Sequence, residues 1–262
     1  MAKVGVVSSL WRYPVKSMRG EELDEAVVCF GGIYGDRLFA FTSDARPAGF
    51  PWLTGREQRA LLLYRPRFRY PDQALGPPNL SEAEAIDPGL NTVVGTPAAL
   101  SVEVETPAGD VFAVDDPALA DTLGQDRIGE VLTLVRSDRP LTDARPVSLF
   151  SLQTAAQLGN ELGFELDKRR FRANIYLDLE DGEGFGEDAF VGRQLQIGPR
   201  VVVHVLERDP RCAMIAIDPD TSERNAAVLK QVADEHESRA GVYGAVLVEG
   251  TIRPGDEVQF VD

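Results

Sequence analysis

The chain has 262 residues, 44% hydrophobic and 26% charged, a composition typical of a globular protein with two compact domains or one large β-rich domain. Its 42 acidic and 27 basic residues give a net charge of -15, which disfavours binding to nucleic acid or to an anionic membrane surface. The N-terminus, MAKVGVVSSLWRYP, lacks the apolar core of a signal peptide, and no window approaches the roughly 20 apolar residues of a bilayer span. We therefore expect a cytoplasmic protein that binds neither nucleic acid nor a membrane.

Short runs of β-type residues dominate the first half of the chain. They predict strands within 4–15, 25–30, 37–43, 101–107 and 131–137. The segment 71–98 is rich in Pro, Gly, Ala and acidic residues, which predicts a long surface excursion between strands. DPALADTLGQD at 116–126 predicts a short connecting helix, and we place a domain boundary there, between a domain at 1–120 and one at 121–262.

The second half combines two helices with more strands. A Ser-capped helix is predicted at 151–163 and a second helix at 222–237. Strands are predicted in FRANIYLDL, RQLQIG and RVVVHVLE, and the punctuation of GVYGAVLVEGTIRPGDEVQFV fits the closing strands of a barrel. The pattern predicts a mostly β protein with some helices, of the α+β class.

The common catalytic templates are missing from this sequence. It contains no Walker loop, no G-x-G-x-x-G, no G-x-S-x-G and no zinc-type Cys/His spacing. The two histidines, His204 in a predicted strand and His236 in a predicted helix, are most simply structural or surface residues. The acidic loop DLEDGEGFGED at 178–188 does not keep the EF-hand alternation, which favours a solvated loop over a calcium site.

Three short segments carry groups suited to binding an anion: YPVKS at 13–17, GDR at 35–37 and RRFRANI at 169–175. Arginine grips phosphate in a bidentate manner, lysine acts as a point charge, and Ser or Asn adds neutral hydrogen bonds. From spacing alone, however, basic residues at strand ends in an acidic protein usually form surface ion pairs. The candidates are Lys16, Ser17, Arg37, Arg172 and Asn174.

The two cysteines, Cys29 and Cys212, lie in unlike contexts and form no disulfide or cluster-binding framework. In RDPRCAMIAIDPDTS, Cys212 stands beside Ala, Met and Ile, where a free cysteine usually packs as a small hydrophobe. Arg208 and Arg211 would instead favour a thiolate. Without a nearby base, such a thiolate suits a soft-metal ligand better than a nucleophile, provided that another group supplies the remaining ligands.

Eight segments in order resemble the MOSC-domain proteins that carry a MOSC N-terminal β-barrel domain, a group that includes the mitochondrial amidoxime-reducing component and its bacterial relatives. These segments are LWRYPVKSMRG, GGIYGDR, LTGRE, DARPVSLFSL, RRFRANI, FGEDAFVGRQLQIG, PRCAMIAIDPDTS and GTIRPGDEV. The resemblance implies an N-terminal β-barrel-like domain, a C-terminal MOSC β-barrel domain and a molybdenum cofactor. That cofactor is a pyranopterin whose dithiolene gives molybdenum two sulfurs.

The resemblance also assigns roles to individual residues. Cys212 occupies the position of the metal ligand, and Asp143 matches an acidic position near the metal. The five anion-binding candidates fall where family members hold the pterin and its phosphate. Three positions depart from the usual family pattern, at Ala173, Phe190 and Ser222, and these changes bear on the substrate pocket rather than on the cofactor residues.

The activity implied is the reduction of N-hydroxylated compounds such as amidoximes, hydroxylamines and N-hydroxylated bases. We expect no intrinsic iron–sulfur cluster, haem or flavin, because two cysteines cannot hold a cluster and the chain ends at QFVD without the ferredoxin domain of some relatives. Electrons would then come from a separate protein: a ferredoxin, a cytochrome b5-like protein or a flavin reductase. The alternatives are a carrier of the cofactor or of sulfur on Cys212, and a degenerate member that binds neither.

Overall fold

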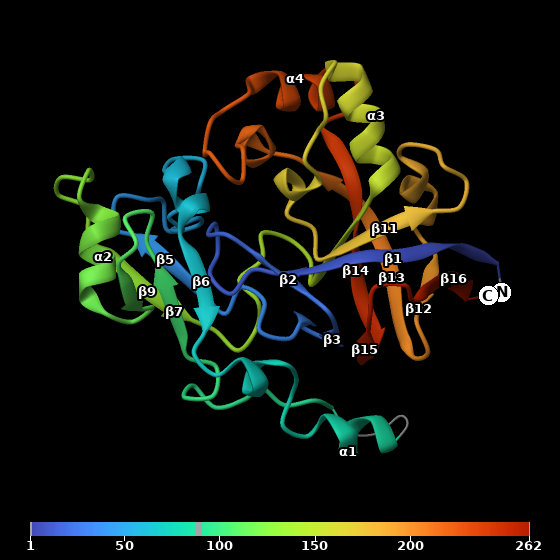
Figure 1. Cartoon of the computed structure of the whole chain (residues 1–262), viewed down its shortest axis with the longest axis horizontal. Coiled ribbons are helices and arrows are strands. Elements are labelled where there is room, and N and C mark those ends of the chain that lie inside the picture. Colours follow the sequence, from blue (N-terminus) through green and yellow to red (C-terminus); the bar gives the residue numbers. More distant parts are fainter. Residues whose placement is uncertain (1, 87–90, 262) are drawn as a thin grey trace.

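The computed structural model describes residues 2–86 and 91–261. A large β-barrel with two helices forms one side, and smaller sheets form the other (Figure 1). Seven strands close the barrel in the order β11–β10–β14–β13–β12–β16–β1, with β1 pairing back to β11. Their bounds are β1 Lys3–Arg12, β10 Val147–Ser151, β11 Ile175–Leu179, β12 Gln194–Ile197, β13 Val201–Pro210, β14 Arg239–Val248 and β16 Glu257–Val261.

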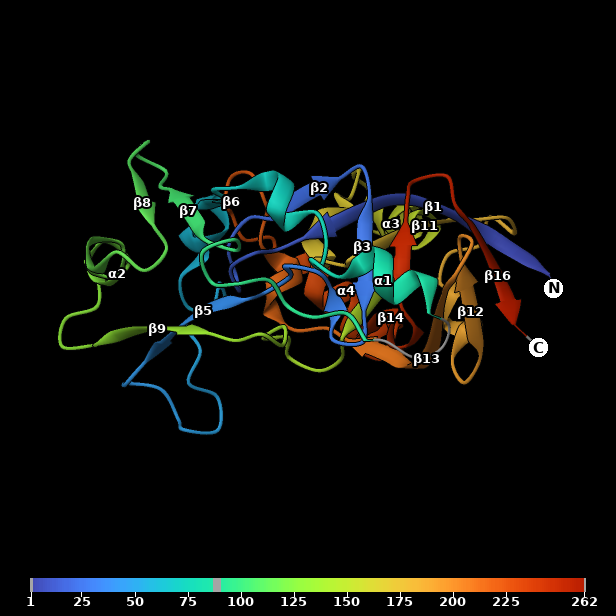
Figure 2. The same cartoon turned by 90° about the horizontal axis from the view of Figure 1, so that it is seen from below.

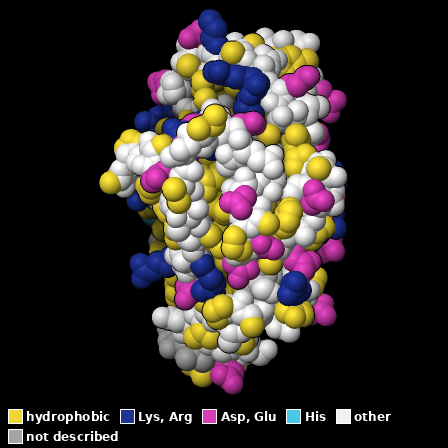
Figure 3. All heavy atoms as spheres, turned by 90° about the vertical axis from the view of Figure 1, so that its left-hand side faces the viewer, with side chains coloured by type: hydrophobic (Ala, Val, Ile, Leu, Met, Phe, Trp, Pro, Cys, Tyr) yellow, Lys and Arg dark blue, Asp and Glu magenta, His cyan; other side chains and the backbone are white. Residues whose placement is uncertain are grey.

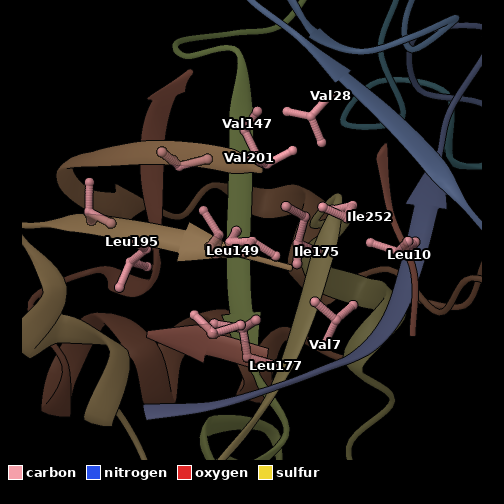
Figure 4. Close-up of a cluster of buried hydrophobic side chains, with 14 of the residues drawn as sticks. Val7, Leu10, Val28, Val147, Leu149, Ile175, Leu177, Leu195, Val201 and Ile252 are labelled. Atoms are coloured by element: carbon pink, nitrogen blue, oxygen red, sulfur yellow. The ribbon is translucent and has the colours of Figure 1, made fainter. Parts of the chain in front are cut away.

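Alternation of buried and exposed side chains along the strands builds the barrel core. In β1 the side chains of Val7 and Leu10 are buried, and they meet Leu149, Ile175 and Leu195 from other strands inside the barrel (Figure 4). All strand neighbours are antiparallel except β10 and β11. Since β1 and β16 are adjacent, the two ends of the chain lie side by side (Figure 1).

Close approach of β1 to β11 requires a glycine at position 5. A Cβ atom on Gly5 would lie 2.4 Å from the carbonyl oxygen of Asp178 on β11. No side chain fits that space without moving a backbone strand. Gly5 therefore allows the first strand of the chain to close a barrel that is otherwise made by the second half.

Two helices cover the barrel at one end. Helix α3 (Leu152–Leu162) begins at Ser151, whose side chain accepts a hydrogen bond from the Thr154 amide, and ends at Gly163 with φ 76°. This confirms the Ser-capped helix predicted at 151–163. Helix α4 (Ala226–Glu235) is shorter than the predicted 222–237, because residues 217–224 form a turn closed by a bridge between Ile217 and Arg224. His236 thus lies just beyond the helix rather than inside it.

Three short sheets lie outside the barrel: one, β3–β4–β15, packs against the barrel core, and the other two, β5–β9 and β6–β7–β8, lie at the opposite end of the molecule from the termini (Figure 2). Helix α2 (Pro117–Gly124), capped by Asp116, also lies at that distant end and is the connecting helix predicted at 116–126. Helix α1 (Leu80–Ala85) lies in the predicted excursion 71–98, of which residues 87–90 fall outside the described part. The strands of these sheets are β3 Ala26–Cys29, β4 Gly32–Ile33 and β15 Gly250–Ile252; β5 Phe39–Ser43 and β9 Leu132–Arg136; and β6 Arg65–Phe68, β7 Val102–Glu105 and β8 Val111–Ala113. Strand β2 (Glu21–Leu23) pairs with β1 and extends the barrel sheet.

The structure confirms the predicted class, since the described residues are mostly β, with four α-helices and a closed barrel. Strands occur in each of the segments predicted from the first half. The domain boundary near residue 120 stays a prediction, and β1 pairs within the barrel of the second half. No helix in the described residues has both the length and the apolar character needed to cross a bilayer.

Candidate functional site

A cavity of about 270 Å³ is lined by segments from both halves of the chain. It collects the loop after β1, the GDR turn, the loop before β10, the loop before β11 and the turn after β13. All the residues predicted for a site line this one cavity: Lys16, Ser17, Arg37, Asp143, Arg172, Asn174 and Cys212. The structure thus brings them together, and their binding of a cofactor stays a prediction.

Three of these residues hold a left-handed backbone conformation. The φ angles are 65° at Ser17, 46° at Arg37 and 52° at Arg172. Residues other than glycine seldom adopt positive φ angles, and each such residue costs about 1–3 kcal/mol. Backbone hydrogen bonds hold two of the turns, from the Arg37 amide to the Tyr13 carbonyl at 2.7 Å and from the Arg172 amide to the Arg169 carbonyl at 3.1 Å. Three of the seven non-glycine residues with positive φ in the described chain are therefore predicted anion-binding residues of this cavity.

Tyr13 joins the basic residues of the two halves. Its ring contacts both guanidinium groups, with the central carbon of Arg37 4.6 Å and that of Arg172 4.2 Å from the ring centroid. The fully buried Asp36 accepts a hydrogen bond from the Tyr13 amide at 2.8 Å and pairs with Arg37. Arg37 Nη2 in turn donates to the Arg172 carbonyl at 3.1 Å. These contacts hold both guanidinium groups against the Tyr13 ring.

Arg172 has an unused donor inside the protein. Its Nη2 atom is shielded from solvent and has no hydrogen-bond partner in the described residues. Burial, together with the nearby charge of Arg37, lowers the pKa of Arg172 to about 10 against the opposing effects of Tyr13 and Asp36. The group still carries its charge at neutral pH. A buried donor without a partner is costly, so an anion in the cavity would satisfy it.

Lys16 is already paired in this structure. Its Nζ atom donates to Asp143 Oδ1 at 2.5 Å and to the Leu141 carbonyl at 2.7 Å. Burial lowers the pKa of Lys16, and the Asp143 carboxylate opposes that shift. Lys16 therefore anchors the loop at 141–143 to the cavity wall. Asp143 remains half-exposed, with its side chain at 49% relative exposure, so part of its carboxylate faces open space.

Asn174 connects strands rather than pointing a free amide into the cavity. Its Nδ2 atom donates to the Trp11 carbonyl of β1 at 3.3 Å, and its Oδ1 atom accepts from the Ser148 hydroxyl of β10 at 3.2 Å. Ser17 is buried and also lines the cavity, and no hydrogen bond of its hydroxyl is found among the described residues. Of this neutral pair, Ser17 is the freer to meet a ligand.

Cys212 stands at the turn between β13 and the 3₁₀ helix Ala213–Ala216. Its thiol is free and partly exposed to the cavity. The neighbouring Arg211 is held by the Ala240 carbonyl at 2.7 Å, the Phe171 carbonyl at 2.9 Å and an ion pair with Asp209 at 2.8 Å. Arg208 lies outside the cavity lining and pairs with Asp188 and Glu237, so it does not support the thiolate as the sequence indicates.

Several lining residues were not selected from the sequence. Arg56, Asp209 and Tyr243 line the cavity, and Asp36 and Tyr13 orient its arginines. Burial raises the pKa of Asp209 to about 6, against the opposing charge of Arg211. Tyr13, Asp36, Asp209 and Arg211 lie within or beside the predicted segments, so proximity along the chain was an available signal for them. Arg56 lies in the LTGRE segment of the family resemblance but was not selected as a site residue, and Tyr243 lies outside the segments chosen for anion binding.

Two family models match the chain. The MOSC domain matches residues 136–259 and the MOSC N-terminal beta barrel domain matches residues 4–76. This chain belongs to the MOSC-domain proteins with a MOSC N-terminal β-barrel domain. The predicted family is thereby confirmed. No curated protein matched the sequence.

Several solved structures are distantly similar to this one. The YuaD protein of Bacillus subtilis has 12% identity and a TM-score of 0.44, with 97% of this chain and 94% of that chain covered. YiiM of Geobacillus stearothermophilus has 20% identity and a TM-score of 0.33, over 45% of this chain and 55% of that one. YiiM of Escherichia coli has 15% identity and the same TM-score of 0.33, over 45% and 55%.

MOSC domains are a molybdenum-cofactor-binding family, and the residues of this cavity fit such a group. The shielded, unpartnered Nη2 of Arg172 offers a donor to a phosphate, and the free thiol of Cys212 offers a soft donor to a metal. The described residues contain no group of three or more His, Cys, Asp or Glu side chains placed to hold a metal ion. A metal on Cys212 would take its other ligands from the cofactor.

Proposed function

We propose that this MOSC protein is a molybdenum-cofactor-dependent reductase of N-hydroxylated compounds such as amidoximes, hydroxylamines and N-hydroxylated bases. One observation carries the proposal: a free thiol and an unpartnered, shielded guanidinium line the same cavity. The first suits a soft metal and the second an anion, and a molybdenum pterin with a phosphate contains both.

The proposal divides the cavity between the parts of the cofactor. Arg172 and Arg37 would hold the phosphate, with Ser17 adding a hydrogen bond and Lys16 a positive charge. Cys212 would bind the metal. When bound, the cofactor supplies two-electron oxygen-atom transfer chemistry. The protein's own contribution is to hold these donors in place, and the paired contacts of Tyr13 with both arginines do so before any ligand arrives.

Asp143 is the residue we assign to the substrate side. Its Oδ1 atom is bonded to Lys16, which fixes the carboxylate at the edge of the cavity, and the side chain remains half-exposed. The free oxygen would accept a hydrogen bond from an N–H or O–H group of an N-hydroxylated substrate and thereby orient it. Electrons would come from a separate redox protein: a ferredoxin, a cytochrome b5-like protein or a flavin reductase.

The test uses protein produced in a host that makes the cofactor. We expect about one molybdenum atom per chain and repeated reduction of benzamidoxime to benzamidine with reduced viologen as donor. Product per chain is followed over time with donor in excess. A plateau at or below about one equivalent across a panel of N-hydroxylated substrates would instead favour a carrier of cofactor or sulfur. Protein without molybdenum from a competent host would contradict both the reductase function and a role as cofactor carrier.

A further inference from the structure

The basic residues that line the cavity differ in whether a carboxylate already neutralises them. Seven of them line it, and five have an acidic partner at 2.5–2.8 Å: Lys16, Arg37, Arg145, Arg170 and Arg211. The two others, Arg56 and Arg172, have no carboxylate partner in the described part of the chain. The proposed function assigns Arg172 to the cofactor phosphate. It leaves Arg56 without a ligand.

Arg56 lies at the open edge of the cavity on the side of Cys212. Its side chain is exposed, its guanidinium carbon lies 4.6 Å from the centroid of the Phe50 ring, and its Nε atom donates to the Thr54 hydroxyl at 3.3 Å. A Cβ atom on Gly55 would lie 3.0 Å from the Met214 side chain, so this loop rests on the turn that follows Cys212. Arg56 and Cys212 thus line the same cavity, and their two segments are in contact.

The nearest acidic side chain along the loop is engaged elsewhere. Glu57 accepts hydrogen bonds from the amide and hydroxyl of Thr54 and pairs with Arg46 at 3.6 Å. Its carboxylate thus braces the loop and leaves the terminal nitrogens of Arg56 unpaired. The ring of Phe50 and the bond to Thr54 hold the guanidinium in one orientation, which lowers the entropy cost of binding a ligand.

The lining of this cavity is basic, although the chain as a whole is acidic. On the face shown in Figure 3, basic and acidic side chains are interspersed, whereas the cavity lining has seven basic residues and only two carboxylates, Asp143 and Asp209. Arginine binds carboxylates through a bidentate fork, and a local excess of positive charge attracts anions despite the net charge of the chain.

We infer that the substrate of this site carries an oxyanion in addition to its N-hydroxyl group, and that Arg56 binds this oxyanion. The inference rests on the proposed reductase function. A substrate with a carboxylate is the appropriate test compound, because a guanidinium group can donate two parallel hydrogen bonds to a carboxylate. Arg56 is thus a specificity-determining residue that selects anionic N-hydroxylated compounds over neutral ones.

The test compares 4-carboxybenzamidoxime with its uncharged isostere 4-carbamoylbenzamidoxime, with reduced viologen as donor. We expect kcat/KM to favour the carboxylate by about tenfold in the unmodified protein, mainly through KM. In Arg56→Gln this ratio should fall toward one, while Arg56→Lys should retain part of it as a point charge. The matched control is Arg59→Gln, which removes the same charge from an exposed residue outside the cavity lining and should leave the ratio unchanged.

Binding of the product 4-carboxybenzamidine, measured by calorimetry without any donor, separates this inference from the proposed function. If no amidoxime is reduced but the carboxylate product binds more tightly than its carbamoyl analogue, and Arg56→Gln removes the difference, the reductase function fails and the oxyanion site stands. If both amidoximes are reduced with equal kcat/KM, the oxyanion inference is overturned and the reductase function stands.

Discussion

Two cavities share the wall residues Thr142 and Ala144, and each is lined by one of the two cysteines of the chain. The cavity of Cys29 has a volume of about 550 Å³ and includes the exposed apolar side chains of Phe30 and Val93. The cavity of Cys212 is half that size, at about 270 Å³, and is bordered by seven basic residues. Only Arg139 contributes a positive charge to the first.

The difference shows that the surroundings of a thiol decide its chemistry more than the thiol itself. Burial raises the pKa of Cys29 to about 12, the Glu249 carboxylate adds to this shift, and a hydrogen bond with Thr92 opposes it. A thiol in that state is a poor metal ligand, because metals bind the thiolate. Cys212 instead lies in a cavity whose positive charge suits an anionic ligand.

The largest expected effect on activity comes from replacing each cysteine, in turn, by alanine. Cys212→Ala should lose all metal-dependent turnover and its molybdenum while remaining folded, because it removes a ligand and little buried volume. Cys29→Ala should keep both and lower the free energy of unfolding by about 1 kcal/mol. Molybdenum content, turnover and chemical denaturation measure the three quantities. Loss of molybdenum from folded Cys29→Ala would reverse the assignment of the two cysteines.

A smaller effect is expected when one positive charge is removed from each cavity. A charge-assisted hydrogen bond contributes about 1.5–3 kcal/mol, so Arg172→Gln should weaken retention of the cofactor by roughly 10- to 100-fold. The matched control is Arg139→Gln, an exposed residue of the other cavity, which should retain the cofactor normally. Retention is measured as molybdenum and pterin fluorescence left after extended dialysis. Equal losses from both variants would remove Arg172 from the phosphate site.

Local signals predicted the elements of this fold better than their arrangement. Ser151 and Asp116 both cap the helices expected from their sequence positions, since a cap depends on residues within one turn. Closure of the barrel by β1 required contacts across more than 160 residues, to β11 and β16, which no local pattern encodes. The combination of a MOSC N-terminal segment and a MOSC segment indicated the barrel only through resemblance.

The same limit applies to the candidate site. Lys16, Arg37 and Arg172 were selected because charged residues at strand ends and glycine turns favour anions, and the structure places them in one cavity. Their partners were not predictable: Lys16 is paired with Asp143 from 127 residues away, and Arg37 with the carbonyl of Arg172. Which cation keeps a free donor is decided by packing between distant segments, and so Arg56 was missed.

The smallest expected effect is the pH dependence of the free energy of unfolding that the burial of Cys29 causes. A cysteine in an unfolded chain titrates near about 8.5, whereas burial raises the pKa of folded Cys29 to about 12. Between these values the folded state keeps a proton that the unfolded state releases. The contribution of Cys29 to stability is therefore fully present below pH about 8.5 and is lost as pH rises toward about 12.

Two measurements check this sign. The free energy of unfolding should decline less between pH 8.5 and pH 10.5 in Cys29→Ala than in the unmodified protein. Cys29→Ser, which keeps a polar side chain but has no titrating thiol, should behave like Cys29→Ala. Alkylation of Cys29 by iodoacetamide in folded Cys212→Ala should be slow at pH 7 and accelerate up to the highest pH at which the fold survives, because only the thiolate reacts. A plateau in that rate near pH 8.5 would show that burial does not protect this thiol, and the contrast between the two cavities would then rest on their basic residues alone.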